Sequence, residues 1–329
     1  MDQSVKKEKS SFSMWLKEHK EEVAAYCGLA FCIILFSVVT PFFGQSIWDS
    51  TKLSTLITDV IVLGLMSVGS VFIYALGNMD ISIGKQIGLY ATLMVIIGNS
   101  TGSLILGIVV CLAIAIVIGA ANGAIGDLLH IHPVVSSVVF MMAIGGINTA
   151  IYLPTGSRNI TYLGFNKAPF KNPWIMIAVL VIEILIVSYI FYFTKVGKYA
   201  RMIGANQKAA QQAGVHIIKY KIIAYIVTGV FLVVAALFMM GYTGSSSDST
   251  GTGYEMNVIV ALVLGGMPIS GGMRSKVSCA VVGSFTLALL QVGLPMLGVS
   301  NAMVLFIKAL IFLVVVVITC RKKGLILPR

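Results

Sequence analysis

The sequence predicts an all-α fold, a polytopic bundle of membrane helices with about ten transmembrane segments. Of its 329 residues, 58% are hydrophobic and 11% are charged, whereas a soluble domain carries roughly a quarter charged residues. The apolar runs are long and unbroken, unlike the alternating pattern of transmembrane barrels, and helices satisfy their own backbone hydrogen bonds in lipid. A glycine-containing motif that occurs twice further predicts two related halves and candidate broken or re-entrant helices.

Most of the apolar segments have the roughly 17–25 residues that a bilayer core requires. They cover residues 23–43, 53–76, 81–98, 104–125, 133–153, 174–194, 217–241, 255–269, 277–298 and 302–320. The segment at 255–269 is short for a full crossing. We divide the chain into a tail (1–22), a transmembrane domain (23–320) with one long cytoplasmic loop at 195–221, and a basic tail (321–329). One apolar helical face in the first tail predicts a short interfacial helix, with a frayed polar tail as the alternative.

The charge distribution predicts the orientation. With the N-terminus in the cytoplasm, most basic residues lie inside, including Lys85 and those of the long loop. Two polar stretches, 154–173 and 241–254, lie outside. The basic residues outside are only Lys52, Arg158, Lys167 and Lys171. By the positive-inside rule both termini are cytoplasmic, so the net charge of +11 reflects topology and we expect no nucleic-acid partner.

The repeated motif reads LGNMDISIG at Leu76–Gly84 and LGGMPISGG at Leu264–Gly272, with six of nine positions identical. Backbone groups freed by such a break are tolerated at membrane depth only beside protein or a water-filled cavity. Interrupted segments at corresponding places in two halves point to a transporter's binding region; two similar cytoplasmic turns are the alternative. The predicted solute pathway comprises Asn78, Asp80, Ser82, Asn257, Gly265, Gly266 and Ser270.

The cytoplasmic loop contains a candidate docking helix. Asn206 is predicted to cap a helix over residues 207–213, which Gly214 ends in a left-handed turn. A helix of two turns is marginal alone in water, so its small face, with Ala209 and Ala210, predicts a docking partner. A connecting loop with incidental helix is the alternative.

Ionisable side chains inside the apolar segments are few. An ionised group at the bilayer centre costs roughly 2.5–3.5 kcal/mol on insertion scales, so these side chains should face the bundle interior. We expect a structural contact of Asp59 or Glu183 with Lys308, with a proton relay as the alternative.

No motif predicts a metal, a cofactor or a catalytic residue. His130 and His132 alone make a weak pair of ligands, and Pro133 instead predicts the start of a helix. The five cysteines lack the spacing of a zinc site or a disulfide framework. Neither a Walker A loop nor a dinucleotide fingerprint is present.

Three stretches resemble the permease subunits of bacterial ABC importers for ribose and related sugars, within a larger family that includes branched-chain amino-acid permeases. The first motif matches at Asp80, Ser82 and Gly84. The segment GANQKAAQQAGV resembles the part that docks on the ATPase, at Gly204, Asn206, Ala209, Ala210 and Gly214. The stretch GTGYEMNVIVALVLGGMPISGG resembles the late hallmark of the family, at Gly251, Gly253, Tyr254, Glu255, Gly265, Gly266, Gly271 and Gly272.

The resemblance implies a transport subunit, not an enzyme, in the bacterial cytoplasmic (inner) membrane. Its implied partners are an ABC ATPase subunit, an extracellular or lipid-anchored substrate-binding protein, a second permease copy or related permease, membrane lipid and a small sugar-like solute. Asn78 and Pro268 depart from the family pattern, so the identity of the sugar does not carry over. The alternatives are an ion-coupled secondary transporter using Asp59, Asp80 and Glu183, and a non-transporting sensor or scaffold.

Overall fold

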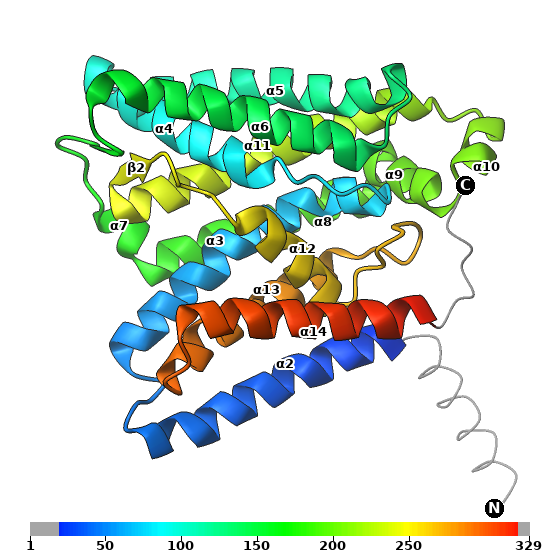
Figure 1. Cartoon of the computed structure of the whole chain (residues 1–329). Coiled ribbons are helices and arrows are strands. Elements are labelled where there is room, and N and C mark those ends of the chain that lie inside the picture. Colours follow the sequence, from blue (N-terminus) through cyan, green and yellow to red (C-terminus); the bar gives the residue numbers. More distant parts are fainter. Residues whose placement is uncertain (1–19, 322–329) are drawn as a thin grey trace, which may run out of the picture.

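The computed structural model describes residues 20–321, which form a bundle of helices with two very short strands (Figure 1). Within these residues, seven spans are long and apolar enough to cross a membrane. They are α2 (Lys20–Val39) with η1 (Thr40–Phe43), α3 (Ser50–Ala75), α5 (Leu104–Leu128), α6 (Pro133–Tyr152), α8 (Pro173–Phe193), α11 (Ile217–Thr243) and α13 (Val277–Met296). The all-α membrane fold is therefore confirmed, and the predicted interfacial helix of the first tail lies largely outside the described residues, as does most of the basic tail.

The other three predicted crossings are helices as well: α4 (Ile83–Thr101), α12 (Tyr254–Leu264) and α14 (Asn301–Arg321). At 1.5 Å per residue, the 11 residues of α12 rise roughly 16 Å, about half of a hydrocarbon core. The prediction of a crossing over 255–269 is therefore wrong, because the helix stops at Leu264 before the glycine pair that follows. Figure 1 shows that α4 and α12 both begin within the length of the bundle.

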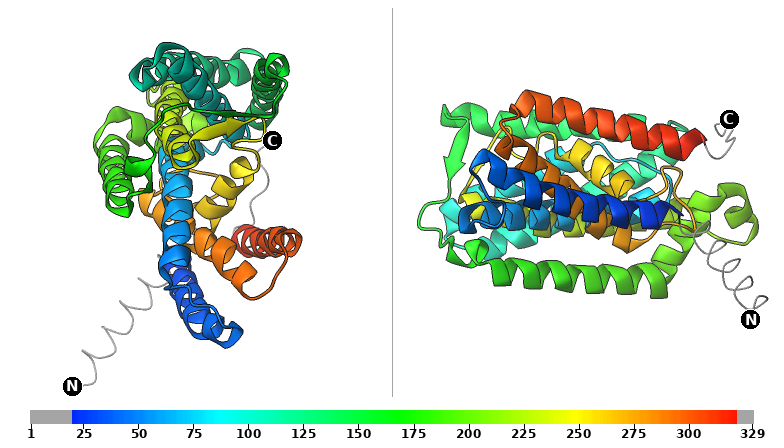
Figure 2. Two further views of the ribbon diagram at one scale, coloured as in Figure 1. Left: turned by 90° about the vertical axis from the view of Figure 1, so that its left-hand side faces the viewer. Right: turned by 90° about the horizontal axis from the view of Figure 1, so that it is seen from below.

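The centre of the bundle is formed by α3 and α11. Nearly every side chain of α3 after Asp59 is buried, and α11 packs against α3, α4 and α5. The helices α2 and α14 lie on one side, and α5 and α6 lie on the opposite side (Figures 1 and 2). The outer helices expose large apolar side chains, including Phe31, Val117, Met142, Leu185 and Leu313. Apolar surface this extensive fits contact with lipid and not with water.

The two ends of the bundle differ in structure. One end, here called the α10 end, carries α9 (Lys195–Ala205) and α10 (Gln207–Gln212), together with the start of α2 and the end of α14 (Figure 1). The other, the strand end, carries η2 (Leu153–Thr155), β1 (Asn159–Thr161), α7 (Ala168–Lys171) and β2 (Ser245–Ser247). The antiparallel pairing of β1 with β2 joins the two polar stretches that were predicted outside, so the prediction that they share one end is confirmed.

Candidate functional site

The first copy of the repeated motif forms a break between α3 and α4. Gly77 has a φ of +77°, and its N–H donates to Tyr74 O (3.0 Å) while Asn78 N donates to Ile73 O (3.2 Å). These two bonds form a Schellman C-cap, in which the left-handed residue is usually glycine. The chain then returns into the bundle from the α10 end before α4 begins (Figure 1).

A buried polar network holds this break in place. Asp80 Oδ1 accepts hydrogen bonds from Ser82 N (2.8 Å) and Ser82 Oγ (2.5 Å), and Asp80 Oδ2 accepts one from Asn122 Nδ2 of α5 (3.1 Å). Ser136 Oγ of α6 donates to Asn122 Oδ1 (3.2 Å), and Gln86 Nε2 donates to Ser82 Oγ (2.7 Å). None of these side chains is more than 4% exposed. The network joins the break to α5 and α6, and the lining of a solute path by Asp80 and Ser82 stays a prediction.

The second copy of the motif ends α12 with the same type of turn. Gly266 has a φ of +88°, and its N–H donates to Val263 O (3.0 Å) while Met267 N donates to Leu262 O (2.9 Å). The left-handed residue stands one position later in this copy, and the helix that it ends has 11 residues against 26 for α3. Gly265 packs directly against the backbone of α13, so close packing of two helices requires it to be glycine.

The two copies of the motif contact each other at the α10 end. Gly272 N donates to Ala75 O (2.9 Å), and a Cβ atom at Gly77 would lie 2.7 Å from Ser270 O. Gly204, near the end of α9, packs against both copies. Any side chain there would overlap the carbonyl of Ala75, the residue before the first copy, and lie 3.0 Å from Leu76 C and 2.7 Å from Gly272 N. One of the predicted ATPase-coupling residues therefore lies against both breaks.

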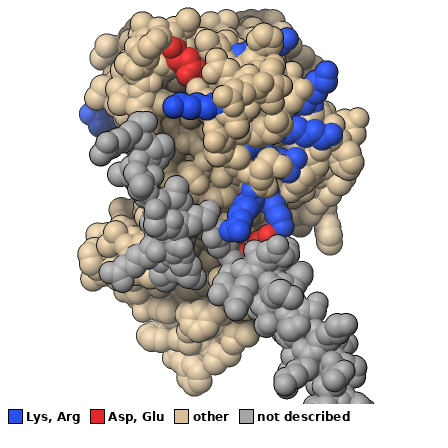
Figure 3. All heavy atoms as spheres, turned by 90° about the vertical axis from the view of Figure 1, so that its right-hand side faces the viewer, with Lys and Arg blue, Asp and Glu red and all other residues tan. Residues whose placement is uncertain are grey.

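The predicted docking helix forms as α10. Asn206 Oδ1 accepts a hydrogen bond from Ala209 N (3.0 Å), and Gly214 has the left-handed φ of +82°. Ala210 is buried, whereas Ala209 is exposed. Figure 3 shows that Lys and Arg outnumber Asp and Glu on the face at this end of the molecule. The exposed residues of α10 are therefore three glutamines, Lys208 and the small Ala209, on a basic face.

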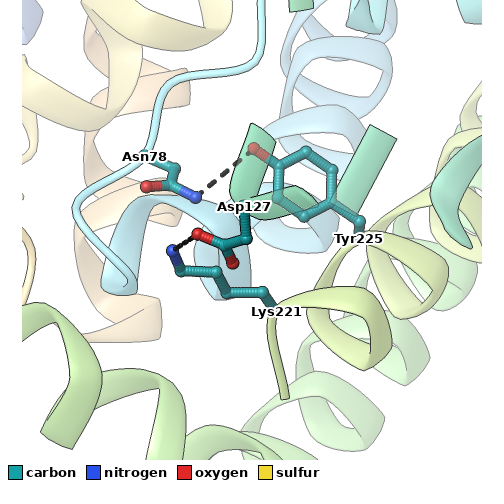
Figure 4. A network of polar contacts seen from close by, with 4 residues as sticks. All are labelled: Asn78, Asp127, Lys221 and Tyr225. Carbon is teal, nitrogen blue, oxygen red and sulfur yellow. Dashed lines mark hydrogen bonds and ion pairs between the residues drawn. The ribbon is translucent and has the colours of Figure 1, made fainter. Parts of the chain in front are cut away.

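Asn78 belongs to a second polar cluster beside the first break (Figure 4). Its Nδ2 donates to Tyr225 OH of α11 at 3.5 Å, a long contact. Lys221 Nζ, also on α11, forms an ion pair with Asp127 Oδ1 of α5 at 2.6 Å, and their side chains are only 7% and 22% exposed. The cluster connects α5, α11 and the break.

A contact inside the bundle corrects one part of the predicted topology. Lys85, in the first turn of α4, donates a hydrogen bond from Nζ to Thr252 Oγ1 (2.9 Å), although the charge distribution predicts these residues at opposite membrane surfaces. The polar stretch after β2 returns into the bundle and meets the start of α4 there (Figure 1). Glycines permit this approach, because a Cβ atom at Gly84 would overlap the Gly251 carbonyl. Lys85 and Thr252 therefore cannot lie at opposite membrane surfaces, and the prediction that placed them there is wrong.

The intramembrane charges separate into two groups. Lys308 Nζ donates to Asn257 Oδ1 (3.1 Å), and Asp59 interacts with Lys308 electrostatically. Glu183 is 4% exposed, lies beside Gly69 of α3, and has no hydrogen-bond partner for either carboxylate oxygen within residues 20–321. Asp59 therefore interacts with Lys308 through its charge and not through a hydrogen bond. The predicted alternative, a contact between Glu183 and Lys308, is wrong.

An ion pair at the α10 end ties α2 to the segment after the second break. Lys276 Nζ lies against Glu22 Oε1. This hydrogen bond raises the pKa of Lys276 above its ordinary value, against the opposing effect of desolvation. Both side chains are about one-third exposed, so solvent screens the pair and its effect on stability is modest.

In the described part of the chain, no group of three or more His, Cys, Asp or Glu side chains could hold a metal ion. His132 instead caps α6, where its Nδ1 accepts a hydrogen bond from Val134 N (3.4 Å). Pro133 is the first residue of that helix, as predicted.

Sequence reasoning missed Asn122, Gln86 and the Lys221–Asp127 pair. Asn122 was detectable, because it is a lone amide among small residues inside an apolar run, and polar groups in such runs face the bundle interior. The ion pair was not detectable, because its partners are 94 residues apart and no local pattern relates them.

These features define a multi-pass membrane protein with two glycine-based breaks and a surface helix that contacts them indirectly through α9. Residues 52–316 match the family described as "Branched-chain amino acid transport system / permease component". The matched region includes both copies of the motif and the α9–α10 segment. The chain therefore belongs to this family of permeases.

Among curated proteins, the ribose import permease protein RbsC of Escherichia coli (strain K12) is 26% identical over 319 residues, 94% of this chain and 95% of the relative. The galactose/methyl galactoside import permease protein MglC of Salmonella typhimurium is 26% identical over 313 residues, 89% and 90% of the two chains. The autoinducer 2 import system permease protein LsrD of Salmonella paratyphi A is 27% identical over 311 residues, 92% of each. No solved structure matches the chain.

Proposed function

We propose that this chain is the transmembrane permease subunit of an ATP-driven importer for a small sugar or sugar-like solute. The names of the relatives, which import ribose, galactose or autoinducer 2, support the solute class. The observation that carries the coupling mechanism is the position of Gly204, which packs on the backbone of both breaks. A force applied to α9 and α10 would reach the interior through this contact.

The α10 end is the proposed docking site of the ATPase subunit. Its basic face (Figure 3) supports a cytoplasmic location by the positive-inside rule, with both termini on the same side and the protein in the inner membrane. The proposed docking surface for the partner consists of α10, with its exposed Ala209, and the left-handed turn at Gly214 that follows it. Because Gly204 has no side chain to yield, movement of α10 and α9 would displace Ala75 and Gly272 and so alternate access from the two sides.

The proposed solute path runs beside the start of α4 and α12. Lys85 is partly exposed, and Thr252 and Met256 are exposed, although these residues lie inside the length of the bundle. An ammonium group facing acyl chains at that depth would cost roughly 2.5–3.5 kcal/mol. This face is therefore proposed to meet a second copy or a related permease, with the aqueous path between them. A binding protein would deliver the solute at the strand end.

Reconstitution tests the proposal. The permease, a co-purified ATPase and its binding protein are placed in liposomes, and uptake of labelled sugar is measured with and without ATP. We expect uptake only with ATP and binding protein, and we expect Ala209→Glu to abolish ATPase binding. Ser249→Glu, a like charge in the polar loop at the strand end, is the matched control and should leave ATPase binding intact.

Two outcomes would overturn the proposal. Uptake driven by a proton or sodium gradient, without ATP or partners, would establish a secondary transporter. Normal assembly with no uptake under either driving force would instead indicate a sensor or scaffold.

A further inference from the structure

A column of polar side chains and glycines runs along the contact of α4 with α6 and with the polar stretch around β2. One face of α4 meets one face of α6, with the spacing of three and four residues that places side chains on one side of a helix. The α4 positions are Lys85, Gly88 and Thr92, and the α6 positions are Gly145, Asn148 and Tyr152. The third element contributes Thr252, Thr250 and Ser246 in the same order.

The first layer of the column surrounds Lys85. Its Nζ donates to Thr252 Oγ1 at 2.9 Å, and its aliphatic part passes Gly145, where a Cβ atom would lie 3.7 Å from Lys85 Cδ and Cε. A larger residue at that α6 position would displace the lysine. The ammonium group is thus held at the inner end of the column.

The second and third layers lead from Lys85 towards the strand end. Gly88 packs against the Thr250 carbonyl, and a Cβ atom at Gly88 would lie 3.6 Å from Asn148 Nδ2. Beyond it, Thr92 Oγ1 lies 3.0 Å from the hydroxyl oxygens of both Tyr152 and Ser246. Thr250 also lines a cavity of about 470 Å³ at the strand end, so the column reaches that cavity.

Two groups in the column are unsatisfied. Asn148 is 1% exposed, and within residues 20–321 neither its Nδ2 nor its Oδ1 has a hydrogen-bond partner. No carboxylate of the described residues lies within 4 Å of Lys85 Nζ. Of the neighbouring carboxylates, Asp80 is bonded within its own network. Glu255 accepts from Gly253 N and packs against Gly84, the residue before Lys85, without forming an ion pair with the lysine. The buried amide has no partner, and the cation has the neutral Thr252 hydroxyl but no anion, so a polar, anionic ligand would satisfy both.

We propose that this column is a solute-binding site and that the transported solute carries an anionic group, a carboxylate or a phosphate, which Lys85 binds. Asn148 and Thr252 hydrogen-bond its hydroxyl groups. The solute is then an acidic sugar and not a neutral one. The inference rests on the proposed function, and it adds the chemical class of the solute and the residue that selects it.

The test uses the complete importer in liposomes with four labelled probes: D-ribose, D-galactose, D-galacturonate and ribose 5-phosphate. We expect ATP-driven uptake of at least one acidic probe and little of the neutral ones. Lys85→Gln should lower acidic uptake by roughly tenfold or more, the usual loss for one hydrogen bond to a charged group. Lys85→Arg should restore most of it. Lys171→Gln, at an exposed position of α7, is the matched control and should transport as the parent does.

The outcomes separate this inference from the proposed function. ATP-driven uptake of the neutral sugars alone, or acidic uptake that Lys85→Gln leaves unchanged, would overturn the anionic solute while the importer stands. Weaker association of two permease copies in Lys85→Gln, together with neutral-sugar uptake, would assign the lysine to the contact between copies and also overturn it. The probe panel needs no variant, so a Lys85 variant that fails to fold still leaves a decisive result. Absence of ATP-driven uptake for every probe would overturn both proposals.

Discussion

Replacing Asp80 with alanine is expected to destabilise the whole bundle, because this carboxylate is the shared acceptor of the network that holds the first break. The substitution removes the acceptor of Ser82 N and of Ser82 Oγ, both fully buried. Asn122 Nδ2 keeps a weaker contact with Ser82 Oγ at 3.4 Å. At roughly 1–3 kcal/mol for each buried donor left without a partner, the two Ser82 donors together predict a loss of about 2–6 kcal/mol.

An exchange of the two interacting groups provides the control. In Asp80→Asn an amide N–H of residue 80 would face the amide N–H of Asn122. In Asn122→Asp a carboxylate oxygen would replace Nδ2, which lies 3.1 Å from Asp80 Oδ2, so two carboxylates would face each other. The double variant restores one donor and one acceptor, so it should regain much of the stability that each single variant loses.

Thermal unfolding of the detergent-purified protein, followed by size-exclusion chromatography, measures all four variants. Additive losses in the double variant would refute the pairing. An Asp80→Ala protein that melts like the parent but no longer transports would refute the structural role and place the carboxylate on the solute path.

Three further substitutions test other parts of the structure. Gly204→Val should abolish ATP-driven uptake while the ATPase still binds in pull-downs; Gly146→Ala, where a Cβ atom meets nothing within 4 Å, should transport normally. Lys221→Met leaves Asp127 partly buried without its cation, so the melting assay should show a loss of about 3–5 kcal/mol, and an unchanged midpoint would refute the importance of the pair. Glu183→Gln should keep ATP-driven uptake, since neither carboxylate oxygen has a hydrogen-bond partner within residues 20–321; lost uptake would favour ion coupling.

The features that the sequence predicted well are the ones that depend on neighbouring residues. Asn206 caps α10 and Gly214 ends its turn because capping needs only a side-chain oxygen and a residue that tolerates positive φ. Pro133 begins α6 for a similarly local reason, since its missing N–H is not needed in a first turn. The long apolar runs likewise determine the helices themselves.

The features that were missed depend on how helices face one another. Asp80 meets Asn122 and Lys85 meets Thr252 across intervals that no sequence period describes. The prediction for Lys85 also assumed that every polar stretch between apolar runs reaches a membrane surface. That assumption fails here, because Gly84 and Gly251 let two inward-turning segments touch inside the bundle.

The proposed coupling segment, α9 with α10, and the proposed binding site meet at the start of α4. Gly204 packs on Ala75, the last residue of α3, and only seven residues separate that helix from α4. Within this short segment Asp80 is bonded to Ser82, whose hydroxyl accepts from Gln86 in the first turns of α4. A displacement of α9 would therefore act on α4 through a chain of short hydrogen bonds. Lys85 lies in the same turn of α4 as Gln86. A movement of α10 caused by the ATPase subunit would therefore shift the Lys85 ammonium group relative to Thr252 and release a bound anion.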